Sequence, residues 1–86
     1  MVQLKAGLAI VEVEDGRVLL DTRRGVYWHL NLPALTLIEE LGRGRPFDDL
    51  IRGIAAETGT DEGTVRSDHL ALVYELREAK LIEGDL

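Results

Sequence analysis

The chain has 86 residues, a formal net charge of −6 and no cysteine. The missing cysteine excludes disulfides and thiol chemistry, and the net charge disfavours nucleic acid, which binds chiefly to Lys and Arg. A hydrophobic fraction of 45% and a charged fraction of 30% are typical of one small globular domain, expected over residues 1–86. No apolar run reaches the ~18 residues of a membrane span, and the first residues lack a signal-peptide pattern, so we expect a cytoplasmic protein without membrane contact.

The first half of the chain predicts antiparallel strands after a lead-in, residues 1–7. Residues 8–14 and 17–22 are rich in β-branched and aliphatic residues and flank Asp15-Gly16, a dipeptide typical of a two-residue hairpin turn. That turn would place two cross-strand pairs on the core face: Val13 with Val18, and Val11 with Leu20.

A third strand, Val26 to Leu30, contains the only Trp of the chain. A three-residue loop, Arg23-Arg24-Gly25, would connect it to the second strand, with Gly25 in the left-handed conformation. Three side chains would then point to the core beside Val18 and Leu20, namely Val26, Trp28 and Leu30, while Tyr27 and His29 would point away. This strand would lie at the edge of the sheet, with backbone groups open to further pairing.

Three helices are predicted to follow. The first begins at an Asn31 cap with Pro33 in its first turn, and it ends at Gly42. The second opens at Pro46 and ends at Thr58-Gly59, and the third runs from a Thr60 cap to about Lys80, with Leu81 and Ile82 as a short tail. The result is an α+β fold of the winged helix-turn-helix-like kind, a three-stranded antiparallel sheet followed by three helices.

The third helix carries two apolar stripes about 120° apart. The first consists of Val65, His69, Leu72, Val73, Leu76 and Ala79, and the second of Leu70, Tyr74 and Leu81. One stripe suffices for a core. The second indicates either a helix covered on two sides within the domain, or a groove, a partner or a dimer interface, and the sequence leaves these alternatives open.

No catalytic constellation is found, so a non-catalytic binding module without a cofactor is predicted. Ser67-Asp68-His69 has the residue types of a hydrolase triad, but adjacent helical residues do not face each other. His29 and His69, the only two His, lack the spacing of a metal site. A DNA-binding winged helix is an alternative. The mixed charges of the third helix argue against it, because a helix that contacts DNA presents a basic face.

Three groups of residues carry a resemblance to a known family. They are Asp15-Gly16 with Val18-Leu19-Leu20-Asp21, then Gly25 to Asn31, then the spaced pattern Asp68-His69, Leu72-Val73, Leu76 and Leu81-Ile82. On these residues the chain resembles the PqqD-like proteins, the peptide-recognition domains (RiPP recognition elements) of pathways that modify ribosomally made peptides. It departs from them at His69, usually aliphatic, and at Lys80, commonly Gly.

Within that family the chain is most similar to the stand-alone leader-binding subunit of lasso-peptide biosynthesis, with the pyrroloquinoline quinone-type peptide chaperone as the alternative. The resemblance implies that the leader segment of a precursor peptide adds as a strand to the third strand and packs against the third helix. It also implies presentation of that leader to a separate, transglutaminase-like leader peptidase and a cyclase. We expect a monomer with no metal and no nucleic acid.

The predicted leader-peptide-binding residues come from the third strand and the third helix. They are Val26, Tyr27, Trp28, His29, Leu30, Arg66, Asp68, His69, Leu70, Val73 and Arg77, with Asp68 as a partner for a basic leader residue. The sequence does not determine which flank of the helix faces the strand. On this prediction, Val73→Asp would mainly weaken binding, whereas Trp28→Ala would weaken folding and binding together.

Overall fold

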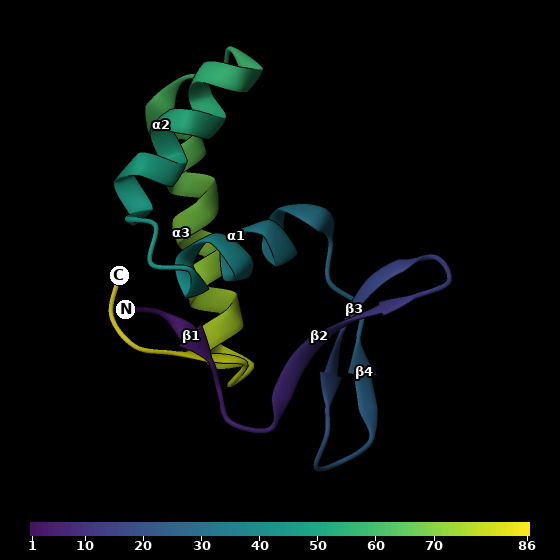
Figure 1. Cartoon of the computed structure of the whole chain (residues 1–86). Coiled ribbons are helices and arrows are strands. Elements are labelled where there is room, and N and C mark those ends of the chain that lie inside the picture. The colour runs from purple at the N-terminus through teal and green to yellow at the C-terminus, as the bar shows by residue number, and fades with distance from the viewer.

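The structure is a computed structural model and describes all residues, 1–86. Its elements are, in chain order, β1 (Gln3–Leu4), β2 (Leu8–Val13), β3 (Gly16–Asp21), β4 (Val26–Trp28), α1 (Leu32–Gly42), α2 (Phe47–Thr58), α3 (Glu62–Glu78) and β5 (Ile82–Glu83). The sheet of β2, β3 and β4 lies on one side of the molecule and α2 and α3 on the other, with α1 between them (Figure 1). The predicted α+β fold, a three-stranded antiparallel sheet followed by three helices, is confirmed.

The start and the end of α1 are as predicted. The Asn31 Oδ1 atom accepts a hydrogen bond of 3.0 Å from the Ala34 N–H, which satisfies one of the free donors of the first turn. Five apolar residues of this helix are buried, namely Ala34, Leu35, Leu37, Ile38 and Leu41. Leu37, Ile38 and Leu41 join the main core between the helices.

The junction of α2 and α3 differs from the prediction by one residue. Gly59, with a φ of 68°, ends α2 in the left-handed conformation, as expected for a helix stop. Asp61, not Thr60, caps α3, because its Oδ2 atom accepts a hydrogen bond of 3.1 Å from the Thr64 N–H. The helix ends at Glu78, slightly before the predicted end at Lys80.

The β2–β3 hairpin has a different register from the one predicted. Val13 pairs with Gly16 and Val11 pairs with Val18, so the turn consists of Glu14 and Asp15. A shift of two residues keeps each side chain on its face of the sheet. The main core, however, lies on the opposite face: Leu19 is completely buried, and its cross-strand partner Ile10 packs against the core. Val18, on the predicted face, is also buried, at 7% exposed, but lies outside this core.

The loop between β3 and β4 has four residues, Thr22–Gly25, rather than three. The Asp21 Oδ1 atom accepts hydrogen bonds from the backbone N–H groups of Arg23 and Arg24, at 3.0 and 3.1 Å, and this closes a wider turn. The additional residue reverses the faces of β4 relative to β3, so that Trp28 lies opposite Leu19. Trp28 therefore points to the core side, as predicted, but beside Leu19 instead of Val18 and Leu20.

The two ends of the chain form a ribbon that the sequence did not indicate. Leu4 of β1 pairs with Ile82 of β5, and Figure 1 shows the two termini close together. Val2 and Ile82 are only 3% and 2% exposed, so Val2 from the lead-in and the tail at Leu81 and Ile82 belong to the core. A two-residue strand is too short to show a hydrophobic period, which explains why the prediction missed this pairing.

Candidate functional site

The free edge of β4 is the first feature of the candidate site. The sheet order is β2-β3-β4, so no strand pairs with the outer side of β4, and the predicted edge position is confirmed. Val26, Tyr27 and Trp28 are 44%, 55% and 37% exposed. Alternate residues of such a strand direct their backbone N–H and C=O groups away from the sheet, where another extended segment can bind them.

A hollow of about 260 Å³ lies beside the end of β4. From the strand side it is lined by Trp28 and the residues that follow, His29, Leu30 and Asn31. From the helical side it is lined mainly by one flank of α3, at Leu72, Glu75, Leu76 and Ala79. The groove between β4 and α3 is thus mostly apolar here, with Glu75 as its one acidic group.

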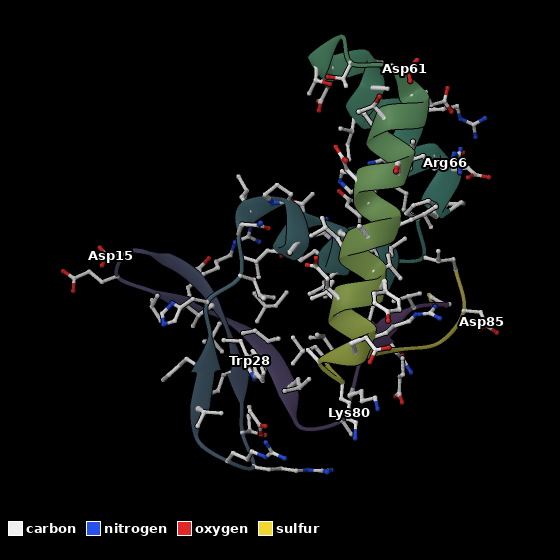
Figure 2. All side chains as sticks on the ribbon, turned by 180° about the vertical axis from the view of Figure 1, so that it is seen from behind. Asp15, Trp28, Asp61, Arg66, Lys80 and Asp85 are labelled. Carbon is white, nitrogen blue, oxygen red and sulfur yellow. The ribbon has the colours of Figure 1, made fainter.

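A second hollow, of about 320 Å³, continues the first toward the turn between β3 and β4. The two hollows share Trp28, Ala79 and Leu81. Together we call them the β4 groove. In Figure 2, Trp28 lies on the sheet toward the lower part of α3, and Lys80 lies just beyond the end of that helix. Trp28, at the end of the open strand, is therefore common to both hollows.

The structure brings together only part of the predicted site. Trp28, His29 and Leu30 line the β4 groove, and Val26 and Tyr27 lie on the same strand without lining either hollow. None of the predicted residues of α3 lines the groove: Arg66, Asp68, His69, Leu70, Val73 and Arg77. Since no observation tests peptide binding at these positions, that assignment stays a prediction.

Two of the predicted cations on α3 are engaged elsewhere. The Arg66 guanidinium bonds to the Asp48 carboxylate of α2 and lies 5.9 Å from the centre of the Phe47 ring, on the side of α3 away from the sheet (Figure 2). This contact holds the pKa of the Asp48 carboxyl below its usual range and raises the pKa of Arg66. Arg77 donates a hydrogen bond of 2.7 Å to the Gly84 carbonyl. The helix therefore lacks the free basic face that contact with DNA phosphates requires.

The remaining predicted residues of α3 are also outside the groove. His69 lies near a separate apolar hollow with Leu32 and Ile54, and its Nδ1 atom is 2.9 Å from the Val65 carbonyl oxygen. Val73 is only 5% exposed and belongs to the core. Asp68 and Leu70 are exposed without lining a hollow.

Leu72, Glu75, Leu76 and Ala79 are the groove residues on the α3 side that sequence reasoning missed. The predicted apolar stripe contains all of them except Glu75, but the stripe alone does not show which part of it faces the sheet. That depends on how α1 separates the sheet from α3, which is a tertiary property. No group of three or more His, Cys, Asp or Glu side chains could hold a metal ion, and no helix has the length and apolar character of a membrane span.

Comparisons with known proteins agree with this geometry. A family model described as coenzyme PQQ synthesis protein D (PqqD) matches residues 16–82. A solved structure described as lasso peptide synthetase B1 complexed with the leader peptide is 28% identical, with a TM-score of 0.85 over 96% of this chain and 98% of that one. A second, described as TbiB1 in complex with the TbiA(beta) leader peptide, is 24% identical, with a TM-score of 0.79 over 98% of both chains. No curated protein matches the sequence.

Proposed function

Because this chain belongs to the PqqD family as a RiPP recognition element, we propose that it binds the leader segment of a ribosomally made precursor peptide. Its homologues among lasso peptide synthetases bind leader peptides. The proposed role is recognition without catalysis. The observation that carries the proposal is the open edge of β4, whose last residue, Trp28, lines both hollows of the β4 groove.

The proposed mode of binding is strand addition to β4. An extended leader would satisfy the outward N–H and C=O groups of Val26 to Trp28, as edge strands allow. Alternate side chains of the leader would point to the same side as Trp28 and enter the β4 groove. The backbone hydrogen bonds would give affinity that does not depend on the leader sequence, and the side-chain contacts in the groove would give specificity for particular leaders.

The apolar end of the groove would hold aliphatic or aromatic leader residues. Trp28, Leu30 and Leu72 form its walls, and Leu81, which is 3% exposed, forms part of its floor. Glu75 stands in this wall, where its carboxylate could pair with a basic leader side chain. We propose Glu75 for the role that the sequence assigned to Asp68, because Asp68 does not line the groove.

We further propose that the bound leader is presented to a separate leader peptidase of the transglutaminase-like kind and to a cyclase, as in lasso-peptide assembly. Ribosomal synthesis of the precursor would place this encounter in the cytoplasm. The pyrroloquinoline quinone-type chaperone is the related alternative. It would require the same groove and a different precursor.

Calorimetric titration with the leader of a precursor encoded beside this gene tests the proposal. We expect saturable binding with a 1:1 stoichiometry and a Kd in the micromolar range or below. A leader of scrambled sequence is the matched control, since it keeps composition and charge. Absence of binding up to roughly 50 μM, or equal binding of the scrambled leader, would refute it.

A further inference from the structure

Basic side chains gather at one end of the β4 groove. Four of the ten Lys and Arg residues of the chain line the hollow near the β3–β4 turn, namely Lys5, Arg23, Arg24 and Lys80. Asp21 is the only acidic residue in that lining. This concentration of positive charge occurs in a protein whose net charge is −6.

These cations are mostly unpaired, unlike the others in the molecule. Lys5, Arg23 and Lys80 make no ion pair within 4.0 Å, and the Arg24 Nε atom lies 3.9 Å from the Asp21 Oδ2 atom. Outside the groove, only Arg43 lacks both an ion pair and a side-chain hydrogen bond. A cation without a partner is available to a ligand.

The one carboxylate in the lining, Asp21, offsets only one of the four positive charges. The Asp21 Oδ1 atom accepts hydrogen bonds from two backbone N–H groups of the β3–β4 turn, at 3.0 and 3.1 Å. Asp21 therefore shapes the turn that carries Arg23 and Arg24. Four cations and one carboxylate leave a formal charge of +3 at this end of the groove, and therefore a positive potential.

The backbone is also adapted to place two of these cations. Gly7 has a φ of +89°, and a Cβ atom there would lie 2.9 Å from the Arg23 Nε atom, so the glycine makes room for the arginine side chain. Lys80 is the only non-glycine residue with a positive φ, 60°. This left-handed residue ends α3, where the Leu81 N–H donates to the Leu76 carbonyl at 3.0 Å, and it places a lysine in the lining of the hollow.

We propose that this end of the groove recognises an acidic segment of the guest peptide. The proposal rests on the proposed function and adds that the two ends of the groove select different residues, apolar at one end and acidic at the other. Apolar guest residues would bind between Trp28 and Leu72, and Asp or Glu side chains would bind beside Lys5, Arg23 and Lys80. At ~3.3 Å per residue, the acidic residues would lie within about four positions of the guest residue that faces Trp28, on the side of the β3–β4 turn.

Selection from a display library of random 16-residue peptides, on the full chain, tests this inference. We expect enriched peptides to combine an apolar residue with Asp or Glu at a fixed distance on one side only. The same selection on Arg23→Glu should remove the acidic preference or replace it with Lys and Arg. Arg43→Glu is the matched control, because it changes the net charge equally at the unpaired arginine outside the groove, and it should keep the preference.

Calorimetry on one selected peptide gives the magnitude. Replacing its acidic residues by Asn or Gln should weaken binding roughly three- to tenfold, as expected for charge-assisted contacts at a partly exposed site. A peptide whose acidic residues are replaced by Lys should bind weakly to the parent protein. Its affinity should be restored by Arg23→Glu and not by Arg43→Glu. Enriched peptides without an acidic preference, or a preference that Arg23→Glu leaves unchanged, would overturn this inference alone. A library in which nothing is enriched would overturn the proposed function as well.

Discussion

Leu19 and Trp28 face each other across the β3–β4 pair and have very different environments. Leu19 is completely buried, whereas Trp28 is 37% exposed. The leucine belongs to the main core, whereas the tryptophan lines both hollows of the β4 groove. We therefore expect Leu19 to act in stability alone, and Trp28 in stability and in the proposed recognition.

Alanine substitutions at this pair should differ in a measurable way. We expect Leu19→Ala to lower the free energy of unfolding by about 3 kcal/mol, because it leaves a cavity in the core. Trp28→Ala should cost only about 1–2 kcal/mol, since part of the side chain is already in water, and it should also weaken leader binding in the fraction that stays folded. Urea denaturation and calorimetric titration measure the two effects. A Trp28→Ala variant that binds the leader normally would contradict the assignment of the groove.

Ala79 offers a way to block the groove without disturbing the core. It is exposed at the end of α3 and lines both hollows. We expect Ala79→Gln to leave the melting temperature nearly unchanged and to weaken leader binding about tenfold or more, because the longer side chain occupies the path of the guest. Ala71→Gln, at an exposed position of α3 outside the groove, is the control and should bind normally. Equal binding by both variants would place the guest elsewhere.

Strand addition makes a prediction about the peptide backbone. N-methylation of single leader residues removes one N–H donor at a time. Binding should weaken roughly three- to tenfold at alternate residues, the cost of one lost hydrogen bond, because only every second residue faces β4. Calorimetry on the series, with the unmethylated leader as reference, gives the pattern. Uniform losses, or none, would argue for a guest that binds as a helix or through side chains alone.

The contact between Asp48 and Arg66 predicts a pH dependence of stability. Because Arg66 lowers the pKa of the folded Asp48 carboxyl, the contact stabilises the fold above the unfolded pKa of about 4, and this contribution is lost as pH falls through the lowered value. Asp48→Asn should therefore melt below the parent at pH 7, and the difference should shrink in acid. Asp68→Asn, at an exposed residue without a partner, should show neither effect. If the difference in melting temperature between Asp48→Asn and the parent did not change with pH, the ion pair would not be the source of that difference.

Val73 requires a correction of the mutational prediction made from sequence. Its side chain is only 5% exposed and packs in the core, so Val73→Asp would bury a carboxylate without a partner. We expect loss of the folded state by circular dichroism, rather than a selective loss of binding. Tyr74→Asp, next to it and 65% exposed, should remain folded. A folded Val73→Asp protein would show that the end of α3 can reorient.

The local features of this fold could be predicted, and the contacts between distant segments could not. Asn31 and Gly59 mark helix ends through their own chemistry, so the helix boundaries were nearly correct. The face of β4 depended on one loop residue, because a hairpin loop of four instead of three reverses every side chain. The three-residue loop therefore assigned Trp28 to the correct side with the wrong neighbours.

The candidate site was predictable to the same extent. The edge position of β4 follows from the order of two hairpins, which the sequence shows. Which side of α3 forms the wall opposite β4 depends on the rotation of that helix about its axis. Both apolar stripes of α3 could form such a wall, so the sequence does not distinguish them. Lys5 lies outside any motif and reaches the groove because the β1–β5 ribbon holds its backbone, where the Lys5 N–H donates to the Leu81 carbonyl at 3.1 Å. Pattern reasoning does not detect two-residue strands of this kind.

The chain has a single tryptophan, and its position in the groove makes the indole an intrinsic optical reporter. Its emission maximum should shift to shorter wavelength when a guest covers the exposed part of the ring, so leader binding can be followed without a label. The same signal monitors unfolding at the sheet, whereas far-ultraviolet circular dichroism monitors the three helices. Coincidence of the two unfolding curves would show that the sheet and the helices unfold as one cooperative unit.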